Sequence, residues 1–326
     1  MAFINLRKVT AKPIAFDCEV GGTQIIIQRH CDYDRKYSGI GSGLVEESAK
    51  EQEGIWRAYA KQIKKLPPEE QKKIKILFVA SPTAGAGGLQ RSVETTKIAR
   101  QVLEAEGINP NQIINNDFKQ NESGVLSYNN WTQPKMFGEK GATEADLKYF
   151  EFLKKATDYN GDMRKIFAAF EDDIYKDVRE QLGAEGPKEI VERMQDSISA
   201  FQRFSKNFHE DNPNHRLLII GASHYDTLSP MAKWLADMPI DKFLGVNYCA
   251  GISVNIDKKG KLSARINDSI FSLIKQGKSY KKQFVGNIKD KVSAGNLINS
   301  QKLLEEKNDD KNRELKNSEK GMAMPH

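Results

Sequence analysis

The chain has 326 residues, a formal net charge of +6 from 50 Lys and Arg against 44 Asp and Glu, and 39% hydrophobic residues. This length accommodates one large α/β domain or two modest ones, and the apolar content suffices for a buried core. The cationic excess is small and interspersed, and no basic run alternates with aromatic residues, so composition gives no indication of a nucleic-acid partner. A small anionic substrate is compatible with it.

The three cysteines, Cys18, Cys31 and Cys249, are odd in number and far apart. Their spacing predicts neither a disulfide framework nor a structural zinc site, and we expect a reducing, cytoplasmic setting. The N-terminal segment lacks the apolar core of a secretory signal, and no window approaches the roughly 18 apolar residues of a membrane span. Peripheral membrane association stays open.

Short aliphatic runs alternate with helical patterns over the first 250 residues or so. Between the first two runs, Ile55, Tyr59, Ile63 and Leu66 recur every three or four residues until two prolines, at 67 and 68, stop the helix. This alternation predicts an α/β fold, a three-layer sandwich with a mostly parallel central sheet flanked by helices. The predicted strands are 23–28, 73–80, 111–115 and 216–223.

Residues 143–208 interrupt this rhythm with consecutive helical patterns, whose apolar stripes, with Ile174 in the first, predict a helical insertion that packs on itself. After the fourth strand, residues 243–268 predict a strand and a hairpin around the turn at 257–260. We therefore expect one catalytic domain over residues 1–285 and a polar, flexible tail over 286–326, which is rich in Lys, Asn and Glu. Nothing in the sequence indicates the oligomeric state.

Three predicted strands end in groups suited to an anion. The first ends in Arg29 and His30, and the second leads through a Gly-rich loop to Arg91 at the start of a helix. The fourth ends in Ser223 and His224. Ligands of open parallel sheets bind outside the carboxyl ends of the strands, so two arginines and two histidines are expected at one edge. Each residue alone would be an ordinary surface or core side chain, and only the joint occurrence points to a site.

This combination suits phosphoryl chemistry. The planar guanidinium of arginine donates paired hydrogen bonds to phosphate oxygens and stays charged. A neutral imidazole beside such a cradle can attack phosphorus and form a phosphohistidine, which divides one difficult step into two easier ones. No metal and no cofactor is required for this route.

In the same order, the segments "IIIQRHCDYDR", "ASPTAGAGGLQRSVETTKIA" and "LLIIGASHYDTL" resemble the three motifs of the histidine phosphatase superfamily, also called the phosphoglycerate-mutase-like fold. In that family one strand ends in Arg-His, a second in Ser-Pro followed by an Arg that opens a helix, and a later one in Ser-His or Thr-His. Residues 42–52 resemble the family's helix entry, with Ser48 in place of the usual Gly. The resemblance covers residues 20 to 265.

The resemblance implies roles for individual residues. His30 would be the nucleophile, Arg29 and Arg91 the phosphate clamps, and His224 a donor to the phosphoryl oxygens. An acidic residue about 25 to 30 positions after the second arginine would protonate the leaving oxygen, which indicates Asp117, with Glu122 as the alternative. These residues at positions 29, 30, 91, 117 and 224 are the expected catalytic set. Arg35, Ser223 and Glu122 are the expected substrate-binding residues, and no metal site is expected.

Two departures from the family pattern stand out. Cys31 replaces the usual Gly, and residues 83–90 lengthen the loop before Arg91. The glycines of that loop do not make a nucleotide-binding P-loop, because the required Gly-Lys-Ser/Thr is missing.

The resemblance predicts a metal-independent phosphohydrolase that acts on a phosphomonoester, either a phosphorylated small molecule or a phosphoprotein. A phosphoglycerate-mutase-type phosphotransferase is one alternative, although the extended segment rich in Glu, Trp and Asn that mutases carry after Arg-His-Gly is missing. A catalytically silent phosphate-binding or interaction module is the other, although such a module would not need all four basic residues.

Overall fold

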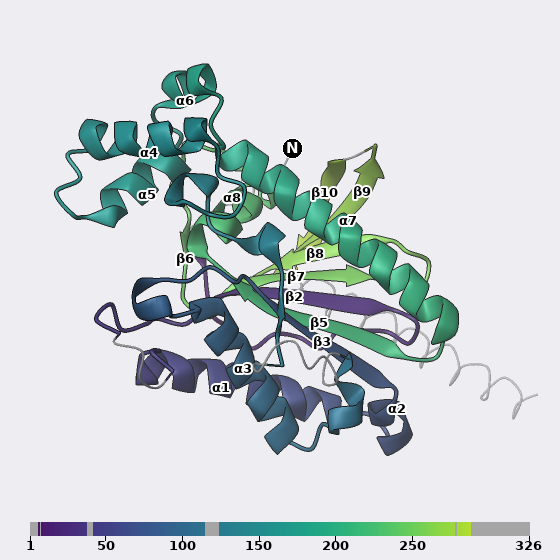
Figure 1. Cartoon of the computed structure of the whole chain (residues 1–326). Coiled ribbons are helices and arrows are strands. Elements are labelled where there is room, and N and C mark those ends of the chain that lie inside the picture. The colour runs from purple at the N-terminus through teal and green to yellow at the C-terminus, as the bar shows by residue number, and fades with distance from the viewer. Residues whose placement is uncertain (1–5, 7, 38–41, 115–123, 278, 288–326) are drawn as a thin grey trace, which may run out of the picture.

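The computed structural model of the chain describes residues 6, 8–37, 42–114, 124–277 and 279–287. Its centre is an eight-stranded sheet in the order β10-β9-β8-β7-β2-β5-β3-β4 (Figure 1). Strands β1 (Lys8–Val9) and β6 (Gly245–Val246) form a separate parallel pair. The eight strands are β2 (Thr23–Arg29), β3 (Ile74–Ala80), β4 (Leu126–Ser127), β5 (Arg216–Ser223), β7 (Gly251–Ile256), β8 (Leu262–Ile266), β9 (Ser269–Gln276) and β10 (Ser279–Asn287).

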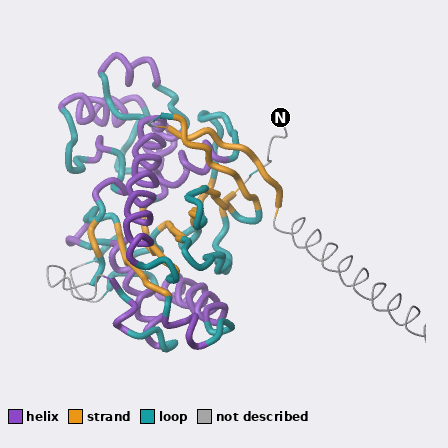
Figure 2. The backbone as a smooth tube through the Cα atoms, turned by 90° about the vertical axis from the view of Figure 1, so that its right-hand side faces the viewer, coloured by secondary structure: helices purple, strands orange, loops and turns teal. Residues whose placement is uncertain are grey.

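The middle strands are continuous apolar runs because helices cover both faces of the sheet. Alternate residues of β2 therefore enter two different cores: Ile25 and Ile27 pack on one face, and Ile26 packs on the other. Helices α7 (Pro187–Asp211) and α8 (Tyr225–Leu235) cover the first face, and α1 (Glu46–Ile63) and α3 (Arg91–Ala105) cover the second (Figures 1 and 2). The short α2 (Pro68–Lys72) begins at the second of the two prolines. The predicted three-layer α/β sandwich is confirmed.

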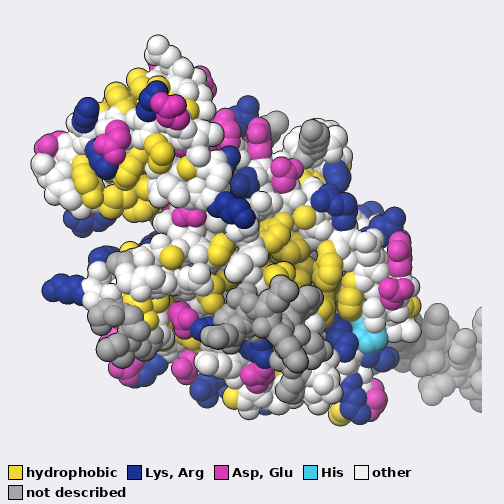
Figure 3. All heavy atoms as spheres, in the orientation of Figure 1, with side chains coloured by type: hydrophobic (Ala, Val, Ile, Leu, Met, Phe, Trp, Pro, Cys, Tyr) yellow, Lys and Arg dark blue, Asp and Glu magenta, His cyan; other side chains and the backbone are white. Residues whose placement is uncertain are grey.

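The insertion forms a lobe with a core of its own. Helices α4 (Glu144–Ala156), α5 (Met163–Glu171) and α6 (Lys176–Leu182) pack around buried side chains that include Tyr149 and Phe170. Helix α4 begins with a capping box between Thr143 and Asp146. In Figure 3 an indentation separates this lobe from the body of the protein. Ile174, expected in the apolar stripe, is instead 62% exposed in the turn after α5.

Two parts of the sheet differ from the expectation. Residues 111–115 were expected as a strand, which is wrong for the described part: a 3-10 turn covers Pro110–Gln112, and Ile113 makes only an isolated bridge to Ile76. The parallel edge is formed by β4 instead, which pairs with β3. The pairings among β2, β5, β3 and β4 are parallel, whereas β7 to β10 extend the sheet in antiparallel fashion beyond the expected hairpin. Residues 288–326 of the expected tail lie outside the described residues.

Strand register brings the predicted site residues to one edge of the sheet. In the parallel β2–β5 pair, Arg29 lies opposite Ser223, and the backbone N–H of His30 donates to the Ser223 carbonyl at 2.9 Å. On the other side of β5, the N–H of Ser81 donates to the Ala222 carbonyl at 3.1 Å. The three strand ends that carry the motifs therefore lie side by side. Among the described loop residues, 3-10 turns also lie at Ala86–Gly88, Asn129–Trp131 and Lys135–Phe137.

Replacing Gly221 by alanine is expected to lower the free energy of unfolding by about 1–3 kcal/mol. A Cβ atom there would lie 2.3 Å from the Trp131 ring and 2.4 Å from the Val79 carbonyl oxygen, which belongs to a neighbouring strand and cannot move aside. The matched control is Gly54→Ala in α1, where a Cβ meets nothing within 4 Å and the helix gains from alanine. Chemical denaturation of both variants measures the difference, and equal stabilities would contradict it.

Candidate active site

The imidazole of His30 sits at the end of β2, buried and fixed in one orientation. Its Nδ1 lies 2.7 Å from the carbonyl oxygen of Cys31. A carbonyl only accepts, so Nδ1 carries the proton and Nε2 of the neutral ring holds a free lone pair. Burial and the nearby positive charge of Arg91 lower the pKa of His30 well below its usual value. The ring is therefore neutral at physiological pH, the form in which it can attack an electrophile.

Two arginines flank this ring. The Arg29 guanidinium donates to the Val246 carbonyl at 2.6 Å and lies over the Tyr248 ring at 3.8 Å. The Arg91 guanidinium lies 4.5 Å from the centre of the Tyr33 ring. The Nε atoms of both arginines are buried and have no hydrogen-bond partner within the described part of the chain. Each guanidinium thus retains donors that an anion could satisfy.

His224 packs directly behind His30, with the two ring centres 5.2 Å apart. Its Nε2 lies 2.9 Å from Ser81 Oγ, which lies 2.9 Å from Thr83 Oγ1, and Thr83 donates to the carboxylate of Glu139 at 3.1 Å. Because an ionised Glu139 carboxylate only accepts, Thr83 donates to Glu139, Ser81 donates to Thr83, and His224 Nε2 donates to Ser81. His224 Nδ1 has no partner among the described residues and would donate to a phosphoryl oxygen only as an imidazolium. Burial and His30 lower the pKa of the His224 ring well below its usual value, so a bound dianion would have to supply the counter-charge.

Cys31 occupies the position where the family resemblance has Gly. Its backbone N–H donates to Thr95 Oγ1 at 2.9 Å, and Thr95 in turn donates to the Arg91 carbonyl at 2.8 Å. The Cys31 thiol points away from the cavity and lies 3.4 Å from the thiol of Cys249, with both buried. The backbone at Cys31 therefore ties the nucleophile to the first turn of α3, while its side chain fills space behind the site.

A cavity of about 630 Å³ opens beside this cluster. Arg29, His30 and Arg91 line it, and most of the remaining wall comes from α5, the first turn of α8 and residues 243–248, with Tyr33, Arg35 and Gln133 completing it. The insertion thus contributes one wall of the cavity through α5. His224 does not belong to the described residues that line it.

Two buried carboxyl groups also line the cavity. Asp226, in the first turn of α8, has both oxygens without a hydrogen-bond partner among the described residues, and burial raises its pKa to about 7. Glu171, at the end of α5, accepts a hydrogen bond from Ser229 at 3.3 Å through one oxygen, and its other oxygen has no partner there. Burial raises the pKa of Glu171 well above its usual value. Both groups can hold a proton near neutral pH, which an exposed carboxyl group cannot do.

The predicted substrate-binding residues have different outcomes. Arg35 lines the cavity at its exposed rim, 5.7 Å from the Tyr33 ring centre. Ser223 does not reach the cavity: its hydroxyl is fully buried and donates to the Trp131 carbonyl at 2.5 Å, so it holds a loop in place instead. Asp117 and Glu122 lie outside the described residues.

Sequence reasoning missed Asp226 and Glu171. Asp226 stands only two residues after His224, but an acidic residue in the first turn of a helix is ordinarily explained by the helix dipole. Glu171 follows an apolar stripe and carries no local signal. The tyrosines at 33, 225 and 248 that surround the arginines have none either, since only the folded chain shows which cation each ring faces.

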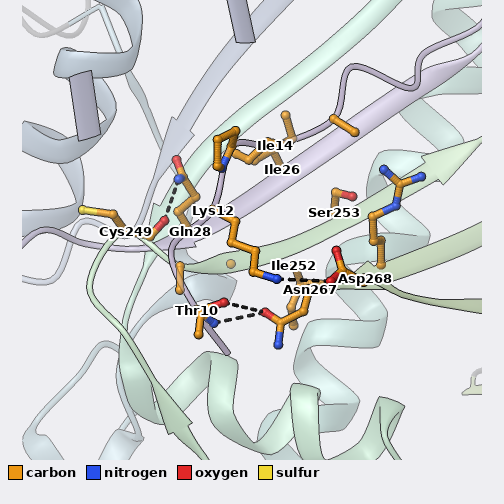
Figure 4. Close-up of a pocket in the computed structure, with 15 residues that line it drawn as sticks. Thr10, Lys12, Ile14, Ile26, Gln28, Cys249, Ile252, Ser253, Asn267 and Asp268 are labelled. Atoms are coloured by element: carbon orange, nitrogen blue, oxygen red, sulfur yellow. Dashed lines mark hydrogen bonds and ion pairs between the residues drawn. The ribbon is translucent and has the colours of Figure 1, made fainter. Parts of the chain in front are cut away.

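A second, smaller cavity lies beside β2 and β7 (Figure 4). Its volume is about 90 Å³, and its cations are already paired: Lys12 with Asp268 at 3.1 Å, and Arg265 with Asp17 at 2.7 Å. Arg265 keeps one buried Nε without a partner among the described residues, but no histidine stands beside it in the described lining of this cavity. Within the described ranges, no group of three or more His, Cys, Asp or Glu side chains could hold a metal ion, and no helix is long and apolar enough to span a membrane.

Fold and cavity together define an α/β protein with two arginines and a neutral histidine at the carboxyl edge of a parallel half-sheet. No family model matches the chain, and no curated protein matches it by sequence. Among solved structures, a mycobacterial glucosyl-3-phosphoglycerate phosphatase is similar, with 13% identity, a TM-score of 0.36 and coverage of 81% of this chain and 98% of that one. A multiple inositol polyphosphate phosphatase from Bifidobacterium longum is similar with 10% identity, a TM-score of 0.44 and coverage of 86% and 92%. These structures are of the family that the sequence motifs resemble; the function below rests on the site residues.

Proposed function

We propose that this protein is a metal-independent phosphohydrolase that removes the phosphoryl group from a phosphomonoester through a phosphohistidine on His30. The observation that carries the proposal is the free Nε2 lone pair of a neutral, buried imidazole between two arginines with unused donors. Arg29 and Arg91 bind the phosphoryl oxygens and offset the charge that spreads over them in the transition state.

The reaction has two steps. In the first, His30 Nε2 attacks phosphorus, the P–O bond to the ester oxygen breaks, and that oxygen takes the proton of Asp226. In the second, water attacks the phosphohistidine, Asp226 accepts the proton from the water, and the P–N electron pair returns to Nε2. Asp226 is suited to both roles because its pKa of about 7 allows either protonation state near neutral pH.

This assignment gives Asp226 the acid role for which the family resemblance implied Asp117. Asp226 lines the same cavity as His30, and its oxygens lack partners in the described part of the chain. His224 assists as an imidazolium once the dianion is bound, held by the hydrogen-bond chain through Ser81. All three cysteines are free thiols, which supports the expected cytoplasmic location.

Purified protein is expected to hydrolyse p-nitrophenyl phosphate in the presence of EDTA. Rapid acid-free quenching should trap a phosphoenzyme that is stable in alkali and labile in acid, as a phosphoramidate is. Release of inorganic phosphate without transfer to added phosphoglycerate separates a hydrolase from a mutase. Activity that disappears with EDTA would contradict the mechanism, and inactivity between pH 4 and 9 together with phosphate binding would favour a silent module.

A further inference from the structure

One face of α5 forms a wall of the cavity next to Arg29, His30 and Arg91, which we call the phosphate cradle. The residues of this helix that line it are Met163, Arg164, Phe167, Ala168 and Glu171, which recur with the spacing of a single helical face. The face runs from the exposed Arg164 at the rim, past half-buried Phe167, to the buried Glu171 at depth. Phe167 packs at a tilt against Phe137, with ring centres 5.1 Å apart, which holds its ring in place.

Other aromatic and apolar side chains line the same cavity. Tyr248, Val246 and Phe243 come from the segment that follows α8. Phe243 is 67% exposed, an unusual position for a phenylalanine unless something covers it. Rings and aliphatic groups thus form much of the wall next to Arg29 and Arg91, and the side chains of Gln133 and Asn247 also line it.

Charge in the cavity is concentrated at the cradle. Apart from Arg29 and Arg91, the cations among its described lining residues are Arg35 and Arg164, both at the exposed rim. Arg164 already pairs with Asp162 through two contacts of 2.8 Å. Among the described lining residues, a leaving group that carries further phosphates would find no further arginine at depth. A leaving group rich in hydroxyls could pair with Gln133 and Asn247, but hydroxyls that face the rings of Phe167 and Phe243 would stay unpaired.

We propose that the cavity selects a phosphomonoester with an aromatic leaving group, an aryl phosphate such as the phosphotyrosyl group. This inference rests on the proposed function and names its substrate class. The phosphoryl group occupies the cradle, and the ring lies against Phe167 with Phe243 at its outer edge. Aromatic rings gain from such edge and offset contacts beyond the apolar area they bury.

The chemistry fits the same two steps. Attack by His30 Nε2 breaks the bond between phosphorus and the phenolic oxygen, and the proton of Asp226 converts the leaving phenolate to a phenol. Since a phenol has a pKa of about 10, its oxygen leaves more readily than that of an alcohol. Water then completes the hydrolysis as above, and no further reactant is needed.

Inhibition by two phosphonates tests the ring site, formed by Phe167 and Phe243, separately from catalysis, because neither compound is hydrolysed. Phenylphosphonate is expected to inhibit about 10-fold more strongly than methylphosphonate. Phe167→Ala and the exposed Phe243→Ala should each reduce this ratio by about threefold or more. Phe152→Ala is the matched control: Phe152 belongs to the same lobe but stacks on Tyr149, away from the cavity, and should leave the ratio unchanged. A ratio near 1 in the wild type, or one that neither cavity variant alters, would overturn the proposal.

Turnover then separates the two sources of an aryl phosphate. We compare kcat/KM for free O-phosphotyrosine, a phosphotyrosyl peptide, a phosphoseryl peptide and glucose 6-phosphate. Preference for the phosphotyrosyl peptide identifies a phosphoprotein substrate, and preference for the free amino acid identifies a small molecule. Equal use of glucose 6-phosphate and O-phosphotyrosine would overturn the aryl proposal and leave the phosphatase intact. Tight binding of phenylphosphonate without turnover of any ester would instead overturn the phosphatase and leave the ring site.

Discussion

Substitution of His30 by glutamine is expected to lower kcat/KM for any phosphomonoester by roughly 10,000-fold or more, because the phosphohistidine of the proposed mechanism forms on this imidazole. The imidazole is the only described nucleophile that both lines the cavity and has a free lone pair directed by its own hydrogen bond. Steady-state kinetics with p-nitrophenyl phosphate measures the loss. The same variant should yield no alkali-stable phosphoenzyme.

The matched control is His215→Gln. His215 precedes β5 at the opposite end of the strand from His224, so it lies far from the carboxyl edge. This control should retain wild-type kcat/KM, and thermal unfolding should show that His30→Gln is still folded. Residual activity within tenfold of the wild type in folded His30→Gln would mean that another group attacks phosphorus.

Substitution of Asp226 by asparagine is expected to lower kcat/KM by about 100-fold for an alkyl phosphomonoester, the usual range for a general acid. For p-nitrophenyl phosphate the loss in kcat/KM should be less than about tenfold, since nitrophenolate leaves without a proton. The value of kcat should fall for both substrates, because the carboxamide of the variant cannot accept the proton of the attacking water. Phosphoenzyme should therefore accumulate in this variant. An equal loss for both esters would argue against the acid role.

The pH dependence of kcat/KM follows from the pKa of Asp226 and from the lowered pKa of His30. Asp226 must be protonated to act as the acid, so kcat/KM for the alkyl ester should fall as the pH rises through about 7, and Asp226→Asn should lack this decline. The pKa of His30 lies well below its usual value, so the imidazole stays neutral in mild acid and activity should persist there. Sustained activity of the wild type far above pH 7 would contradict the role of Asp226.

The pH dependence of the free energy of unfolding provides an independent test of the raised pKa of Asp226. Its carboxyl loses a proton near its ordinary value of 3.8 in the unfolded chain and only near 7 in the folded protein. Between these values the folded state holds the extra proton, so the free energy of unfolding falls as the pH rises from about 4 to about 7 and is level above that range. Asp226→Asn should lack this component, which chemical denaturation at pH 5 and pH 8 resolves.

Much of the fold could be predicted from the sequence. The apolar runs at 23–28, 73–80 and 216–223 marked the three strands that carry the site, because a strand buried on both faces has few alternatives to continuous apolar residues. The run at 111–115 was misleading. It has the composition of a strand, but residues Pro110–Gln112 form a 3-10 turn, next to which the Asn109 N–H donates a hydrogen bond to the Gln112 side chain. Of the described residues in this run, Ile113 alone forms a bridge to β3. Local composition does not show how much of a run finds a partner.

In the candidate site, too, some residues could be predicted from the sequence and others could not. The basic residues were predictable because each follows the end of a parallel strand, and parallel strands place their ends at one edge. The carboxyl groups were not, because what distinguishes Asp226 from the other aspartates is burial without a partner among the described residues, a property of the packed chain. The opposite error occurred for Ser223, whose position at a strand end was right but whose hydroxyl points to the Trp131 carbonyl.

The place of β2 in the middle of the sheet has a consequence for biosynthesis. It is among the first elements to leave the ribosome, yet its two neighbours, β5 and β7, begin at Arg216 and Gly251. Until those segments emerge, its aliphatic side chains and both of its backbone edges have no native partner, a condition that invites chaperone capture or aggregation. Closing such long loops also slows folding. We expect the nascent chain to gain its catalytic cradle only when about three quarters of it has been translated, as a late event governed by non-local pairing.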